Sequence, residues 1–192
     1  MKYLKMFLLI LLFVLPAMVV SAGGPSSLNG KWKLNKKESD DPRAKFAKAW
    51  KDQERSQQRG EQRRERPPES MEPGVRAKQE RPLGLLSDVD EFAITSTDAE
   101  AKIVDSSGKE KTLYLDGRKS EFAADHDRTI GFLARWEGDA LIIDSLANRA
   151  GDVSETLYLS ADAKQLYVKM RMQPLMLENP VTVIRVYDAV GK

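Results

Sequence analysis

The sequence predicts an all-β protein with a helical and then disordered insert, folded as an antiparallel up-and-down β-barrel of about eight to ten strands. From about residue 88 to the end, short segments of alternating apolar and polar residues follow one another, with turn residues between them. One more alternating segment stands alone near residue 32, and a charged segment separates it from the rest. A β-sandwich is the alternative architecture for such a strand pattern.

A secretory leader precedes the folded part. Lys2 and Lys5 form a basic start, an apolar run follows to residue 20, and Val20-Ser21-Ala22 offers the small residues at which a signal peptidase cuts. The apolar run is shorter than the ~20 residues that a membrane span needs, so we expect cleavage and no stable membrane anchor. The predicted organisation is a signal peptide at 1–22 and one β-barrel domain at 23–192, exported to the periplasm or secreted.

The first predicted strand contains Trp32. Leu28, Trp32 and Leu34 alternate with polar residues, which gives this strand one apolar face. We interpret Trp32 as a core aromatic that packs with the two leucines. The alternative is that its ring forms a platform for a ligand inside the barrel.

An insert at about 40–86 interrupts the domain. Asp41 can cap a helix that has Pro42 in its first position, and Phe46 and Trp50 share one face of that helix. The rest of the insert is dense in Arg, Glu and Pro, a composition typical of disorder. A basic amphipathic helix that touches a membrane or a partner protein is the alternative. Interleaved glutamates argue against binding of nucleic acid.

The remaining sequence reads as nine further strands. Turn pairs such as Asp116-Gly117 and Gly138-Asp139 separate consecutive strands and indicate tight antiparallel connections. The predicted strands are EFAIT (91–95), AKIVD (101–105), KTLYLD (111–116), SEFAAD (120–125), TIGFLARW (129–136), ALIIDSL (140–146), SETLYLS (154–160), QLYVKMRM (165–172) and VTVIRVYD (181–188). In QLYVKMRM one face carries only Leu, Val and Met, as a core or a cavity wall does.

Charge and cysteine content exclude several functions. Without Lys2 and Lys5 the 31 Lys and Arg become 29, equal to the 29 Asp and Glu, so the mature chain has no net charge. A neutral chain has no field that favours nucleic acid or an anionic membrane. The sequence contains no Cys, which excludes disulfides, thiol nucleophiles and thiolate metal sites. We expect no cofactor and no metal.

Candidates for catalysis are few. His126 is the single histidine, and its neighbours Asp125 and Asp127 would point to the opposite strand face, so we interpret it as a turn residue. Asp88 and Asp90 could share a strand face as a carboxylate pair, but acids at the start of a strand are usually solvated. Nucleophile elbows, phosphate loops, dinucleotide motifs and zinc spacings do not occur. We therefore predict that the protein is not an enzyme.

Both ends of the folded part resemble calycins. Gly30-Lys31-Trp32 resembles the Gly-x-Trp motif on the first strand of lipocalins, and Arg185-Val186-Tyr187 resembles the last strand of fatty-acid-binding proteins. LNGKWKLNKKESDDP, ARWEGDALII and the RVYD ending are similar to a group of uncharacterised secreted bacterial proteins. The resemblance implies a barrel that closes where the first and last strands pair. It also implies an arginine of the last strand that covers the tryptophan of the first.

Arg185 is the candidate with the most specific chemistry. One face of the last predicted strand carries Val181, Val183, Arg185 and Tyr187, and a mostly apolar face points inward. An inward arginine needs an anion or an aromatic ring, because an unpaired buried charge is very costly. Its partner is either Trp32 or, as the resemblance to fatty-acid-binding proteins implies, a ligand carboxylate that Arg185 and the Tyr187 hydroxyl hold together.

Two functions from different classes remain. The first is a lipocalin-like binding protein for a small, mostly apolar ligand, with or without a carboxylate, that uses Arg185, Tyr187 and Trp32. The second is a non-enzymatic, envelope-associated interaction or structural protein with a barrel core filled by side chains. In the second case the charged insert carries the interaction function.

We predict that export removes the leader between Ala22 and Gly23, because small residues follow a short apolar run there. N-terminal sequencing of protein recovered from the periplasm or the medium checks the cleavage site. An intact Met1 in the membrane fraction would contradict the exported, unanchored assignment.

Overall fold

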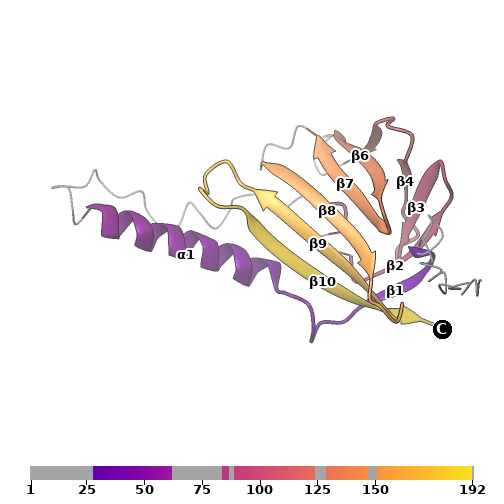
Figure 1. Cartoon of the computed structure of the whole chain (residues 1–192), viewed down its shortest axis with the longest axis horizontal. Helices are drawn as coiled ribbons and strands as arrows, with labels where there is room; N and C mark the ends of the chain where they lie inside the picture. The colour runs from indigo at the N-terminus through magenta and orange to yellow at the C-terminus, as the bar shows by residue number, and fades with distance from the viewer. Residues whose placement is uncertain (1–27, 62–83, 87–88, 124–128, 147–150, 192) are drawn as a thin grey trace, which may run out of the picture.

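The computed structural model describes residues 28–61, 84–86, 89–123, 129–146 and 151–191. Within these ranges the chain forms ten strands and one helix (Figure 1). They are β1 (Gly30–Leu34), α1 (Pro42–Glu61), β2 (Glu91–Ser96), β3 (Glu100–Asp105), β4 (Glu110–Tyr114), β5 (Ser120–Ala123), β6 (Thr129–Glu137), β7 (Ala140–Leu146), β8 (Asp152–Leu159), β9 (Gln165–Gln173) and β10 (Val181–Val190). Every strand segment expected from the sequence is present.

The ten strands form one antiparallel sheet in the order β4-β3-β2-β1-β10-β9-β8-β7-β6-β5. β1 lies between β2 and β10, so the first and last strands pair as expected. The sheet curls until β4 contacts β5 and β6, although no ladder joins β4 to β5. This nearly closed, calycin-like barrel confirms the predicted architecture. The sandwich alternative is wrong, because the described strands make one continuous sheet rather than two stacked ones.

Alternate residues of each strand line the interior. On β9 the inward side chains are buried and the outward Lys169 and Arg171 are exposed, as the sequence pattern predicts. The larger of two buried apolar clusters contains Trp32 and takes buried side chains from β1 to β4 and from β6 to β10. The smaller, which we call the helix-side cluster, consists of Val153, Met170, Met172, Leu177, Val181 and Val183.

Trp32 is a core residue. Its side chain is fully buried, and its indole N–H donates to the carbonyl oxygen of Leu28 at 3.0 Å. Phe92 on β2 and Ala189 on β10 lie directly opposite Trp32 in the two ladders. Gly30, next to this ring, has a φ of 151°, a backbone conformation that favours glycine.

Helix α1 begins as the sequence predicts. The Asp41 carboxylate accepts the backbone N–H of Arg43 at 2.8 Å, and Pro42 is the first helical residue. Phe46, Ala49 and Trp50 pack against the helix-side cluster. The helix therefore docks on its own domain, and its far end extends beyond the barrel (Figure 1).

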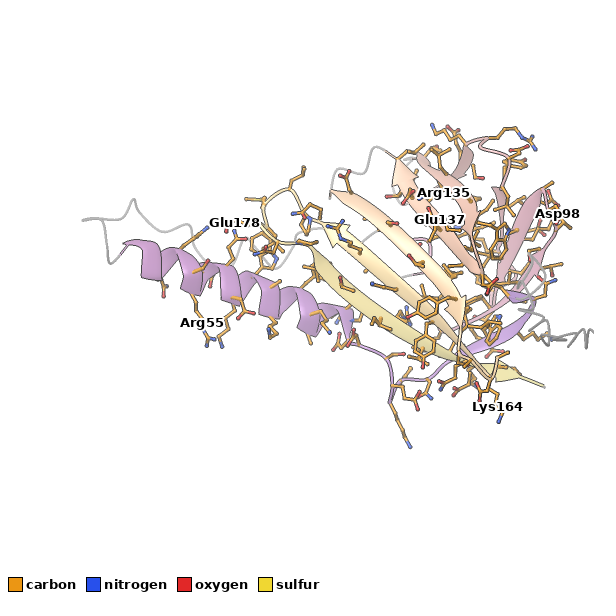
Figure 2. All side chains as sticks on the ribbon, viewed as in Figure 1. Arg55, Asp98, Arg135, Glu137, Lys164 and Glu178 are labelled. Carbon is orange, nitrogen blue, oxygen red and sulfur yellow. The ribbon has the colours of Figure 1, made fainter. Side chains whose placement is uncertain are left out.

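The loop between β9 and β10 holds α1 in place. Gln53 donates to the carbonyl oxygen of Met176 at 3.0 Å and accepts the backbone N–H of Glu178 at 3.0 Å. Figure 2 shows Glu178 beside the helix. The expected leader, the insert beyond Glu61 as far as residue 83, and His126 lie outside the described residues. A search of the described part of the chain finds no helix with the length and apolar content of a membrane span.

We expect Trp32→Ala to lower the free energy of unfolding by about 3–5 kcal/mol, because a large cavity replaces a fully buried ring. Urea denaturation followed by circular dichroism measures the change. Trp32→Phe, which keeps most of the apolar volume, is the control and should cost less. A loss below about 1 kcal/mol for the alanine variant would contradict the central position of Trp32 in the core.

Candidate functional site

Four polar side chains of the barrel wall point into the apolar interior. Lys111 comes from β4, Glu155 from β8, and Arg185 and Tyr187 from β10. Register places Glu155 opposite Met170 and Arg185 opposite Val168, both on the buried face of β9. Glu155 is 2% exposed and Arg185 is 8% exposed. A buried cation and a buried carboxylate on an inward face require partners, because neither can be solvated there.

The partners belong to a short segment just before β2, which we call the inner strap and which comprises residues 84–86 and 89–90. Leu85 and Leu86 are 4% and 0% exposed and belong to the larger apolar cluster. One carboxylate oxygen of Glu155 accepts the backbone N–H of Leu85 at 2.6 Å, and the other accepts that of Leu86 at 3.0 Å. The inner strap therefore enters the core as a turn whose two consecutive amides bind a carboxylate.

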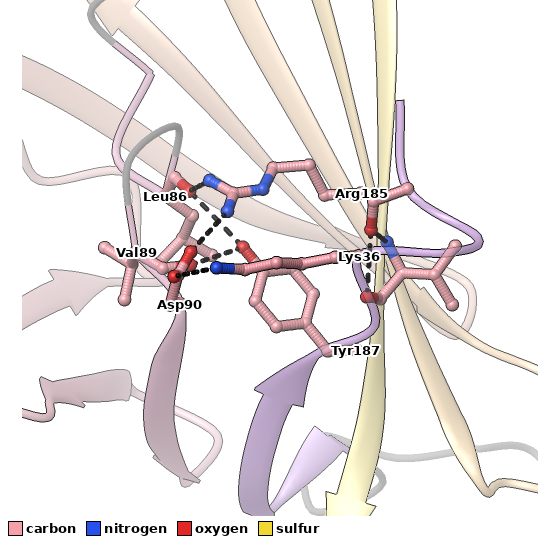
Figure 3. Close-up of polar contacts among 8 residues, drawn as sticks. Lys36, Leu86, Val89, Asp90, Arg185 and Tyr187 are labelled. Carbon is pink, nitrogen blue, oxygen red and sulfur yellow. Dashed lines mark hydrogen bonds and ion pairs between the residues drawn. The ribbon is translucent and has the colours of Figure 1, made fainter. Parts of the chain in front are cut away.

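Arg185 and Tyr187 contact the same segment from the other side (Figure 3). One guanidinium nitrogen of Arg185 donates to the carbonyl oxygen of Leu86 at 3.1 Å, and the Tyr187 hydroxyl lies 3.5 Å from the same oxygen. The hydroxyl also donates to the carbonyl oxygen of Val89 at 2.8 Å. A second guanidinium nitrogen forms an ion pair with Asp90 at 3.2 Å, and Lys36 pairs with Asp90 from outside at 3.2 Å.

Lys111 completes the set of polar contacts. Its ammonium group donates to the carbonyl oxygen of Leu85 at 2.9 Å. Burial lowers the pKa of this ammonium group, and the charge of Glu155 opposes that shift. Burial also raises the pKa of the Glu155 carboxyl, against the two backbone hydrogen bonds and the charges of Lys111 and Arg185. The interior is thus a low-dielectric environment in which each polar group depends strongly on its hydrogen-bond partners.

The structure brings together two of the three residues expected to bind a ligand. Arg185 and Tyr187 are close, with the guanidinium carbon 5.5 Å from the centre of the Tyr187 ring. Trp32 lies opposite Ala189, and Arg185 is four residues from Ala189, about 13 Å along β10. The contact between Trp32 and Arg185 and the ligand role of all three residues stay predictions.

Other residues of the site did not stand out in the sequence. Glu155 interrupts an otherwise apolar face of β8 between Val153 and Leu157. This acidic residue on an apolar strand face was the feature of the sequence that could have identified it. Leu85 and Leu86 ended a segment that otherwise reads as charged and disordered. Asp90, half of the carboxylate pair that the sequence allowed, binds Lys36 and Arg185, and the other half, at position 88, lies outside the described residues. Among the described residues no group of three acidic or histidine side chains could hold a metal ion.

Comparison with known proteins identifies the fold. No family model and no curated protein sequence matches this chain. A secretory abundant heat soluble protein from Ramazzottius varieornatus matches with a TM-score of 0.52 and 11% identity, over 88% of this chain and 99% of that one. The REP1-NXSQ fatty acid transporter matches with a TM-score of 0.50 and 14% identity, over 86% and 97% of the two chains. The zebrafish ileal bile acid-binding protein with cholic acid has a TM-score of 0.49 and 15% identity, over 86% and 100%. The first two matches show that the chain shares the barrel fold of these proteins.

We expect Glu155 to make folding stability depend on pH. The pKa of its carboxyl group is raised in the folded state. As the pH rises, the unfolded chain therefore releases this proton before the folded chain does. The free energy of unfolding then falls from about pH 4.3 until the pH passes the folded-state pKa. The slope from this group is at most about 1.4 kcal/mol per pH unit.

Urea denaturation from pH 5 to 8 tests this expectation on the natural chain and on Glu155→Gln. The natural chain should lose stability relative to the variant as the pH rises. Glu137→Gln, at an exposed position on β6, is the control and should follow the natural chain. Parallel curves for Glu155→Gln and the natural chain would show that the Glu155 carboxyl has an ordinary pKa.

Proposed function

We propose that this protein is an exported, calycin-like binding protein that holds a small, mostly apolar ligand inside its barrel, without catalysing a reaction. The ligand's polar end, a carboxylate or another oxygen acceptor, binds Arg185 and Tyr187, and its apolar part replaces side chains of the interior. The location, in the periplasm or outside the cell, rests on the leader-like sequence at 1–22.

The observation that carries this proposal is a buried guanidinium and a buried hydroxyl that donate to neighbouring carbonyl oxygens inside the barrel. Arg185 donates to the carbonyl oxygen of Leu86 and Tyr187 donates to that of Val89, from neighbouring inward positions of one strand. The Leu86 oxygen marks a position in an apolar interior at which any acceptor receives a charge-assisted hydrogen bond. A few converging polar groups in an apolar enclosure are the usual composition of a small-molecule site.

Two further features support the proposal. Arg185 already binds a carboxylate, that of Asp90, so its geometry suits an acidic group as well as a carbonyl. The barrel also shares its fold with a protein described as a fatty acid transporter. Fold alone does not determine function, and the similarity therefore supports the binding role only together with Arg185 and Tyr187.

A second candidate function has its own observation. Leu85 and Leu86 occupy the interior and satisfy Glu155, Lys111 and Arg185 with backbone atoms. A barrel filled in this way needs no ligand, and the protein would then act as an envelope-associated interaction or structural protein through its charged insert. The two candidates differ in whether the interior ever exchanges the inner strap for another molecule.

We expect the natural chain to bind a fluorescent fatty acid and Arg185→Gln to bind it about 10–100-fold more weakly, because a charge-assisted hydrogen bond in the interior is lost. Displacement titration with dodecanoate measures the affinity, and circular dichroism verifies the fold. Arg171→Gln is the matched control, since Arg171 is exposed on the outward face of β9. Absence of binding, or equal binding by all three proteins, would favour the filled barrel.

A further inference from the structure

The inner strap shows which chemical group the interior recognises. Glu155, Lys111 and Arg185 form hydrogen bonds with backbone atoms of Leu85 and Leu86, whose side chains are apolar. Glu155 accepts N–H groups, and Lys111 and Arg185 donate to carbonyl oxygens. These three polar side chains therefore bind the backbone amide groups, while the two leucine side chains pack among apolar residues.

We propose that the barrel interior is a site for a secondary amide flanked by leucine-sized or longer alkyl groups, as in a short apolar peptide or an N-acylated amino acid. In this interpretation the inner strap is a tethered occupant that such a ligand displaces. The inference rests on the proposed function and narrows its ligand class, because an amide supplies Glu155 with an N–H donor and is therefore preferred to a simple fatty acid.

Electrostatics distinguishes an amide from a free carboxylate at this position. A carboxylate placed at the Leu86 carbonyl would gain Arg185 and Tyr187, but it would stand near the buried Glu155 and leave that side chain without its two donors. A buried acceptor that loses its donors costs about 1–3 kcal/mol, and more when it is charged. The amide between Leu85 and Leu86 satisfies both sides, since its N–H donates to Glu155 and its carbonyl oxygen accepts from Lys111.

Stability alone is a weak reason for such a cluster. Replacing buried ion pairs with apolar residues of similar volume is often neutral or stabilising, by about 1–4 kcal/mol. A barrel that only needed filling could use apolar side chains at the positions of Glu155 and Arg185, as it does at the neighbouring Met170 and Val183. The charged residues supply directional recognition of an amide, which apolar residues cannot.

The fit of the inner strap is close enough to be disturbed by a single atom. A Cβ on Gly84 would lie 2.7 Å from a carboxylate oxygen of Glu155 and 2.9 Å from the sulfur of Met170. Gly84→Ala therefore cannot keep the strap at its present position against Glu155 and Met170. The double substitution Leu85→Ser/Leu86→Ser also displaces the strap, because it removes the apolar side chains that hold the strap in the core.

The test measures binding by isothermal titration calorimetry to the natural chain and to the Leu85→Ser/Leu86→Ser variant. The probes are acetyl-Gly-Leu-Leu-amide for the peptide source and N-dodecanoyl-leucine for the acyl amino acid source. The matched control is the ester analogue of N-dodecanoyl-leucine, in which oxygen replaces the N–H. The variant should bind at least one amide probe tenfold or more tightly than the natural chain does, and it should bind the ester at least tenfold more weakly than the amide.

A further substitution tests the role of Glu155. Adding Glu155→Met to the strap variant should remove the preference for amide over ester, because the acceptor of the N–H is gone. A folded strap variant that binds amide and ester equally, or binds neither probe, overturns the inference. If the natural chain still binds the fluorescent fatty acid in that case, the proposed function survives and only the ligand class is wrong. Gly84→Ala replaces the double variant if the latter does not fold, with the same expected results.

Discussion

The antiparallel pairing of β1 with both β2 and β10 is the constraint on which the rest of the structure depends. β1 has only five residues, yet it joins the start of the meander to its end and so removes two exposed sheet edges. Trp32 lies in the middle of this strand, opposite Phe92 and Ala189, and packs in the larger apolar cluster. Because the two ladders hold the strand in place, Tyr187 and Arg185 on β10 face the interior next to the segment that leads into β2.

That geometry explains why the inner strap lies against the residues of the candidate site. The strap runs into β2, the neighbour of β1, and therefore passes the inward face of β10. Arg185 and Tyr187 contact it from β10, while Glu155 contacts it from β8. Burial makes these polar groups costly when they lack partners, and the strap supplies those partners. A ligand of the proposed kind must match the hydrogen bonds that it displaces.

Helix α1 leaves the barrel on the side of the helix-side cluster. Phe46 and Trp50 cover that cluster, and Gln53 binds the loop between β9 and β10. The contact explains how a helix with a mostly charged sequence stays attached to the domain, since only one narrow apolar stripe packs. The same loop exposes Leu175 and Met176 beside the helix.

The sequence by itself determined the strands, their order along the chain and the start of α1. Each of these depends on local information, namely alternation with period two, turn residues, and the Asp41-Pro42 helix start. The closing pair of strands came from the resemblance to calycins at the two ends of the chain. The sequence also identified Arg185 and Tyr187 as inward residues, because they share a strand face with Val181 and Val183. What only the tertiary structure decided is the set of partners of those residues. Leu85 and Leu86 are buried because barrel closure brings β4, β8 and β10 around them, and Glu155 meets their amides across about 70 residues of chain. Contacts at that separation leave no periodic signal in a single sequence.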